Sequence, residues 1–362
     1  MLIIIHLYVI DHKGELWMDI DTLSIEEKVG QLFIVNFDGT DKTGELIHLI
    51  TYFKVGGLYY RNKNVVNLKK LHKLSTIAQN FAKTGLPLFL ATTQEGENNN
   101  EINHGFTISP SQKMLGKVNN RLYTKQIAEV VAKELRAIGV NMNFSPVLNS
   151  RNDLNEESCF SEDFDHIAKH GVAAVQGYEK GQVCSVVKYF PDISPKNVEN
   201  LFNIPIDRKK SPLYPFYRAV KYGASGVLVN HSLFESLQST SVTEKLLNGI
   251  LRDEAKFNGI IITEANESTN EDFILTFIEA GGDMILLQSN YEHQIKMISN
   301  ILEAVKCGKV SEERINESVK RILSRKEKHQ VGEIPPFNRE SFQRKWSINL
   351  VNRLHERAKV TN

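Results

Sequence analysis

Short apolar runs alternate with longer amphipathic segments along most of this chain. Eight of the short runs are apolar nearly throughout, rather than at every second position. Uniform hydrophobicity is typical of parallel strands that are buried on both faces of a sheet. The eight runs are Gln31–Phe37, Val55–Tyr60, Leu86–Thr93, Val140–Leu148, Val183–Phe190, Gly226–His231, Gly259–Glu264 and Asp283–Gln288.

The segments between these runs place apolar residues three and four positions apart, which predicts amphipathic helices. The clearest are Val65–Ala82, Arg121–Ile138, Asp163–Lys180, Thr243–Phe257 and Tyr291–Lys306. Eight strands that alternate with helices favour an α/β fold of the TIM-type (β/α)8 barrel class. A doubly wound open sheet is the alternative. Its nucleotide-binding version is disfavoured because the chain contains neither GxGxxG nor GxxxxGK[ST].

The pattern divides the chain into one domain with terminal additions. We expect an N-terminal extension over residues 1–22, a single barrel over residues 23–330 and a C-terminal helical tail over residues 331–362. The break at Pro335–Pro336 separates the barrel from the tail. Met1 and Met18 are both candidates for the natural start.

Composition excludes several partners. The 362 residues carry 44 Lys and Arg against 43 Asp and Glu, a net charge of 44 − 43 = +1, so we expect neither nucleic acid nor an acidic membrane as a partner. The apolar start MLIIIHLYVI is too short to cross a bilayer. Three scattered cysteines form no disulfide framework. We therefore expect a cytoplasmic protein, with export through a degenerate signal as the alternative.

Candidate chemistry lies at the ends of the predicted strands, because barrels of this class carry their reactive groups there. The polar residues at these ends are Asp38, Arg61, Gln94, Glu95, Asn149, Lys188, His231, Glu264 and Gln288. Glycoside hydrolysis needs a carboxylate nucleophile and a separate acid/base. Glu264 suits the first role, and the second has no obvious owner. We expect no metal and no cofactor.

Two further groups have plain structural interpretations. His166 and His170 are spaced for one helix face, where we expect solvent rather than a metal ion. The cluster Arg325–Lys328 is expected at an exposed helix end. The pair Gly56–Gly57 and Asp283 are expected to serve the framework.

The order of several motifs resembles glycoside hydrolase family 3, in its β-N-acetylglucosaminidase (β-hexosaminidase) branch. The resemblance runs from about Leu23 to Lys326 and rests on LSIEEKVGQLF, VGGLYYRN, NFSPVLN, KYFP, FNGIIITEA and EAGGDMIL. It implies a TIM barrel that hydrolyses β-linked N-acetylglucosamine. It also implies substrate-binding roles for five residues, which are Lys188, His231, Glu95, Arg61 and Tyr189.

The same comparison of motifs exposes departures in the expected active site. Glu264 stands where the family carries its nucleophilic Asp, one methylene farther from the backbone. Leu201 stands where this branch carries its acid/base His, and Glu199 stands where the partner Asp of that His would be. Ionisable family residues are also replaced at Thr93, Asn98, Asn149 and Ser158, and the loop glycines give way to Asp192-Ile193-Ser194.

Three functions remain open at this point. The first is a catalytically impaired or inactive relative, a pseudoenzyme that retains at most carbohydrate binding or a regulatory role. The second is an active retaining β-N-acetylhexosaminidase with Glu264 as nucleophile and Glu199 as acid/base. The third is an interaction scaffold that binds no sugar. The resemblance implies an N-acetylglucosamine-containing sugar or a muropeptide as ligand. The sequence indicates no protein partner, oligomeric state or pathway.

Overall fold

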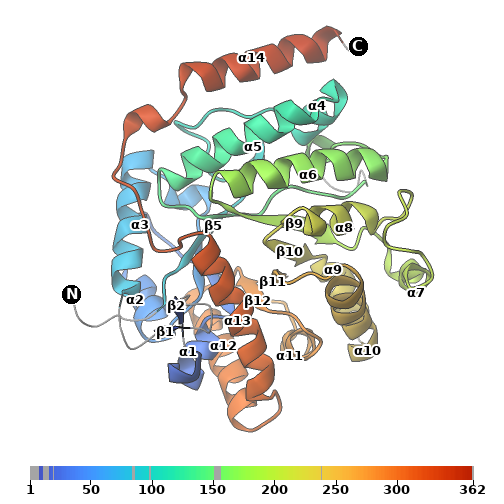
Figure 1. Cartoon of the computed structure of the whole chain (residues 1–362). Helices are drawn as coiled ribbons and strands as arrows, with labels where there is room; N and C mark the ends of the chain where they lie inside the picture. The colour runs from blue at the N-terminus through green and yellow to red at the C-terminus, as the bar shows by residue number, and fades with distance from the viewer. Residues whose placement is uncertain are drawn as a thin grey trace.

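All eight apolar runs contribute a strand to one closed parallel barrel (Figure 1). The computed structural model describes residues 8–10, 16–18, 20–83, 86–97, 99–150, 156–237 and 239–360. Around the barrel the order is β3 (Phe33–Asn36), β4 (Gly57–Tyr59), β5 (Phe89–Thr92), β8 (Met142–Asn143), β9 (Cys184–Phe190), β10 (Gly226–Val229), β11 (Ile260–Ala265) and β12 (Met284–Leu287). The fold is the predicted single-domain TIM-type (β/α)8 barrel.

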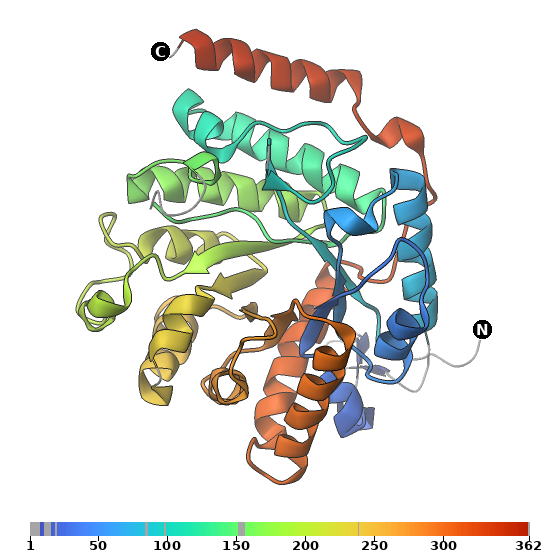
Figure 2. The same ribbon diagram turned by 180° about the vertical axis from the view of Figure 1, so that it is seen from behind.

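Helices surround the barrel on its outer face (Figures 1 and 2). The α-helices are α1 (Ile25–Gly30), α2 (Gly44–Thr51), α3 (Leu68–Ala82), α4 (Gln112–Val118), α5 (Arg121–Arg136), α6 (Phe164–Lys180), α7 (Val198–Leu201), α8 (Tyr214–Lys221), α9 (His231–Leu237), α10 (Thr240–Glu244), α11 (Glu271–Glu279), α12 (Tyr291–Lys306), α13 (Glu312–Lys328) and α14 (Lys345–Val360). Short 3-10 turns are η2 (Ile20–Thr22), η3 (Asn62–Asn64), η4 (Glu156–Ser158), η5 (Pro195–Asn197) and η7 (Arg339–Ser341), and η6 (Lys245–Glu254) is a π-helix.

Outside the barrel, β1 (Tyr8–Ile10) pairs with β2 (Leu16–Met18), and β6 (Gln94–Gly96) pairs with β7 (Asn99–Asn100). Helix α14 packs on α4 and α5 at the outside of the fold (Figure 1). Among the residues that the structure describes, no helix is long and apolar enough to cross a membrane. The domain boundaries expected from the sequence remain a prediction.

The run Val140–Leu148 forms a much shorter strand than its hydrophobicity predicts. Only Met142–Asn143 forms a regular strand, and Val147 adds an isolated parallel bridge to Lys188. Between them, the Asn143 side chain bonds the backbone of Gln94: its Oδ1 accepts from the Gln94 N–H at 2.8 Å and its Nδ2 donates to the Gln94 carbonyl at 3.0 Å. The segment therefore stays bonded to its neighbours after the regular strand ends.

The glycine pair before β4 serves the framework, as expected. A Cβ on Gly56 would lie 2.1 Å from the Gln31 carbonyl oxygen, and one on Gly57 would lie 2.7 Å from the Phe89 carbonyl oxygen. Neighbouring strands can approach this closely only where both side chains are absent.

Asp283, at the entrance to β12, is a fully buried anchor for three arginines. Its carboxylate lies 2.5 Å from Arg252, 2.9 Å from Arg321 and 3.5 Å from Arg314. It also accepts from the Ile261 backbone N–H at 2.8 Å. One carboxylate thus ties β11, β12 and α13 together, which confirms the framework role expected for it.

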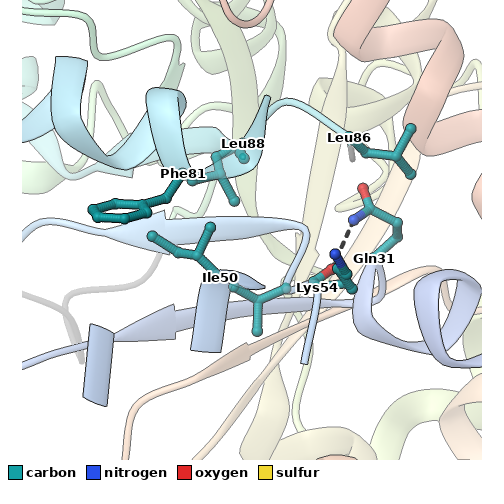
Figure 3. Close-up of a pocket in the computed structure, with 8 residues that line it drawn as sticks. Gln31, Ile50, Lys54, Phe81, Leu86 and Leu88 are labelled. Atoms are coloured by element: carbon teal, nitrogen blue, oxygen red, sulfur yellow. Dashed lines mark hydrogen bonds between the residues drawn. The ribbon is translucent and has the colours of Figure 1, made fainter. Parts of the chain in front are cut away.

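The prediction that Arg325–Lys328 lies at an exposed helix end is wrong for Lys326. Its side chain is buried, and its Nζ donates to Gln31 Oε1 at 2.5 Å. Burial lowers the pKa of Lys326 to about 7. Gln31 in turn donates to the Lys54 carbonyl at 2.8 Å beside a small apolar pocket of about 10 Å³ (Figure 3). The Lys326 amine thus lies in the interior beside Gln31, which comes two residues before β3 at the amino-terminal end of the barrel.

Replacing Asp283 tests the arginine anchor. We expect Asp283→Asn to lower the free energy of unfolding by about 3–5 kcal/mol, because three half-buried guanidinium groups lose their fully buried carboxylate partner. Asp38→Asn is the matched control, since Asp38 pairs with Lys63 at the surface and is 79% exposed. Chemical denaturation of both variants measures the difference. Equal losses for the two would contradict the anchor role.

Candidate functional site at the carboxyl end of the barrel

A buried ion pair lies where β5 and β9 end. Lys188 Nζ is 2.5 Å from Glu95 Oε1, and the two side chains are only 4% and 2% exposed. Burial alone would lower the pKa of Lys188, but the Glu95 carboxylate outweighs it and holds the pKa above its usual range. Lys188 therefore stays protonated, and the two groups satisfy each other inside the fold.

The β6–β7 hairpin positions Glu95. Gly96 turns the chain at φ +120°, and a Cβ there would meet the Pro110 carbonyl oxygen at 2.3 Å. Asn99, on the returning strand, donates to Glu95 Oε2 and to Ser158 Oγ. The carboxylate thus has a partner for each oxygen and a fixed orientation. Sequence reasoning missed Asn99, although its place four residues after Glu95, across a glycine turn, is the signal of a hairpin.

Glu264 ends β11 in the same region and is half-buried. Burial raises the pKa of the Glu264 carboxyl, against the opposing charges of Lys188 and His231. His231 begins α9, where its Nε2 lies 3.5 Å from Glu235 Oε2. Its Nδ1 is buried and has no hydrogen-bond partner among the residues described. The structure thus brings Glu264, Lys188 and His231 within electrostatic reach of one another.

The residues around Tyr189 form a rigid exit from β9. The backbone N–H of Tyr189 donates to Asn149 Oδ1 at 2.5 Å, and Asn149 Nδ2 donates to Asp192 Oδ1 at 3.0 Å. Asp192 Oδ2 also accepts from the backbone N–H and hydroxyl of Ser150 at 2.8 and 2.7 Å. An aspartate at position 149 would face the Asp192 carboxylate, so the asparagine matches this exit.

Three tyrosine side chains lie near the ion pair of Lys188 and Glu95. Lys188 Nζ lies 5.1 Å from the centre of the Tyr189 ring. Tyr59, on β4, hydrogen-bonds Thr93 at 2.8 Å, and burial raises its pKa. Tyr178, on α6, is buried, and this burial raises its pKa to about 12. Both phenols therefore stay neutral beside the ion pair and act as hydrogen-bonding groups.

Two of the predicted site residues are exposed. Arg61 lies two residues after the end of β4, and its backbone N–H donates to Asn64 Oδ1. Glu199 is exposed on α7, which lies at the edge of the fold and away from β11 in both views (Figures 1 and 2). Leu201, on the same helix, is 1% exposed and belongs to the hydrophobic core. Asn98 lies outside the described residues.

The described part of the chain contains no group of three or more His, Cys, Asp and Glu side chains placed to hold a metal ion. His166 and His170 do not share a solvated face as predicted. Their rings stack at 4.7 Å, and His170 is fully buried with its Nδ1 2.8 Å from Thr124 Oγ1. Burial lowers the pKa of His170 to about 4, so its ring is neutral.

Comparison with known proteins agrees with this geometry. The family profile described as "Glycosyl hydrolase family 3 N terminal domain" matches residues 24–325, so the chain belongs to that family. "Beta-hexosaminidase A" of Pseudoalteromonas piscicida is 26% identical over 330 residues, which cover 78% of this chain and 55% of that protein. The chain thus spans about half the length of that relative. "Beta-hexosaminidase" of Idiomarina loihiensis is 26% identical, with 78% and 91% covered.

A solved structure is similar over nearly the whole chain. It is the glycoside hydrolase family 3 beta-N-acetylglucosaminidase from Paenibacillus sp. str. FPU-7, with a TM-score of 0.83 and 26% identity. The superposition covers 93% of this chain and 69% of that one. Family and fold together make this a β-N-acetylglucosaminidase-like barrel.

The buried ion pair is open to a double-mutant test. We expect Lys188→Met to cost about 3–5 kcal/mol of unfolding free energy, because it leaves the Glu95 carboxylate buried and unpaired. Adding Glu95→Gln should recover most of this loss. Lys306→Met, which breaks an exposed pair with Glu26, is the control and should change little. Denaturant titration of these three variants and of Glu95→Gln alone measures the coupling, and additive losses would argue against the pair.

The raised pKa of Glu264 predicts a pH-dependent stability difference. A folded-state pKa above the unfolded one favours the folded protein below the unfolded pKa, and this advantage is lost as pH rises through the folded pKa. At pH 7 the ionised carboxylate therefore costs stability. We expect Glu264→Gln to raise the melting temperature by about 1–3 °C at pH 7 and by almost nothing near pH 4. Glu303→Gln, at an exposed position on α12, should show neither effect.

Proposed function

We propose that this protein binds an N-acetylglucosamine-containing sugar at the carboxyl end of its barrel and hydrolyses it slowly or not at all. One observation carries the proposal: in the loop after β9, the leucine that stands at the expected acid/base position is packed in the hydrophobic core. That residue is Leu201, and Glu199, two residues earlier, is exposed without a hydrogen bond or ion pair among the described residues.

The sugar-binding half of the proposal is supported by what the site retains. Lys188 and Glu95 are oriented and charged, Glu264 offers a carboxyl group, and His231 offers an unpartnered ring nitrogen. These groups can receive and donate hydrogen bonds to sugar hydroxyls. Sugar-directed groups of this kind are held on rigid strand ends, which favours binding in a defined orientation.

The weak-catalysis half is supported by the chemistry of glycoside cleavage. A retaining enzyme needs its acid/base about 5–5.5 Å from the nucleophile, so that the leaving oxygen is protonated as the bond breaks. The start of the loop is tied down by Asp192, and the ring of Phe202 packs under Lys245 at 5.6 Å on η6. Glu199 could reach Glu264 only after these contacts break. General acid catalysis contributes about 10²–10⁴-fold, and its loss leaves slow turnover.

A working hydrolase is the second candidate, favoured by the surviving carboxyl of Glu264. In this alternative α7 swings inward and Glu199 protonates the leaving group. The two candidates differ in rate and not in ligand. We also propose the cytoplasm as the compartment, because the three cysteines are scattered along the sequence and form no disulfide framework.

Turnover and binding measured on the full chain separate the candidates. With an aryl β-N-acetylglucosaminide, we expect a rate at least about 10²-fold below that of the Paenibacillus enzyme assayed alongside. Leu201→His combined with Glu264→Asp should recover little, because the loop and the sugar contacts have also changed. A rate near that of the relative, abolished by Glu264→Gln and not by Glu303→Gln, would contradict the impaired-enzyme proposal.

Binding is measured by calorimetry with N-acetylglucosamine. We expect saturable binding that persists in Glu264→Gln and weakens in His231→Ala, since the first keeps a hydrogen-bonding group and the second removes one. Absence of binding by N-acetylglucosamine and its β-linked oligomers would sink the sugar-binding proposal and favour the scaffold.

A further inference from the structure

The outer helices α5, α6 and α8 line an open cavity at the protein surface. They pack side by side on the barrel (Figure 1), and the cavity between them has a volume of about 530 Å³. That size suits a small ligand. Its lining residues are Asn119, Asn120, Arg121, Leu122, Lys125, Lys169, Val172, Ala173, Gln176, Arg218 and Tyr222. Four of these are cationic, and none is acidic.

Most of this positive charge is not neutralised nearby. The side chain of Arg121 has no ion pair or hydrogen bond among the residues described, and Lys125 meets only the amide of Gln176 at 3.3 Å. Lys169 pairs with Asp165 at 2.7 Å, but the same carboxylate also serves Lys209 at 3.6 Å. The cavity therefore keeps a net excess of positive charge on its walls.

One of the cationic groups, Arg218, is held in place before any ligand arrives. Arg218 donates to the Tyr214 hydroxyl at 2.5 Å, and its guanidinium lies 5.1 Å from the centre of the Tyr222 ring. Arg121 is the first residue of the 16-residue helix α5, whose positive end faces the same space. The positive field reaches inward: burial, His166, Arg121 and Lys169 together lower the pKa of His170.

From this arrangement we propose that the cavity binds a dianionic phosphate group carried on a small polar molecule. Two planar guanidinium groups and two ammonium groups supply more charge than one carboxylate would balance, and arginine forks match phosphate oxygens. The amides of Asn119, Asn120 and Gln176 and the ring of Tyr222 offer contacts for a hydroxyl-bearing carrier such as a sugar. This site is independent of the proposed function at the strand ends.

Calorimetry on the full chain at low ionic strength tests the site with inorganic phosphate and glucose 6-phosphate, and with acetate and glucose as comparisons. We expect both phosphates to bind, glucose 6-phosphate more tightly, and acetate at least about tenfold more weakly. Arg121→Gln with Arg218→Gln should weaken phosphate binding at least about tenfold. Lys320→Gln with Arg353→Gln removes the same charge from exposed positions elsewhere and should not.

A third variant and salt complete the test. Tyr222→Ala should weaken glucose 6-phosphate and leave inorganic phosphate unchanged. Raising sodium chloride from about 20 to about 200 mM should weaken both. The proposal is overturned if neither phosphate binds saturably, if acetate binds as tightly as phosphate, or if the two double variants lose affinity equally while thermal melting shows both folded.

Discussion

Closure of the eight-stranded barrel is the constraint on which the rest of the structure depends. Each strand pairs on both sides, so the carboxyl ends of all eight converge at one rim. Closure brings Glu95, Lys188 and Glu264 together from positions that are far apart along the chain. It also explains the glycine pair before β4, since a closed ring has no room for side chains where neighbouring backbones touch.

The two ends of the barrel manage buried charge in different ways. At the carboxyl end, Lys188 is matched by Glu95 and stays protonated. At the amino end, Lys326 meets the Gln31 amide and the ring of Phe89, with no carboxylate partner among the described residues, so burial favours its neutral form. Asp283 presents a third arrangement, with one carboxylate among three arginines. In this interior, an ionisable side chain stays charged where an oppositely charged group lies beside it. It favours its neutral form where no such group does.

The proposal of weak catalysis rests on how the segment after β9 is packed. Asn149 and Asp192 are hydrogen-bonded to each other at the start of this segment, and Leu201 packs in the hydrophobic core on α7. Under this proposal the site would hold a sugar without cleaving it efficiently.

The sequence alone determined the fold and the family, because the strand–helix pattern and the order of the motifs depend on local spacing. It also identified Glu264, Lys188, His231, Glu95 and Tyr189 as neighbours, since the carboxyl ends of parallel strands always meet. It placed Lys326 at an exposed helix end, although this side chain is buried, because exposure depends on what packs against a residue. Asn99 and the cationic cavity emerged only from the folded chain: Asn99 meets Glu95 across a turn, and the cavity combines residues from three helices. Hydrophobic periodicity carries no information on such contacts, whose geometry arises only when the helices dock.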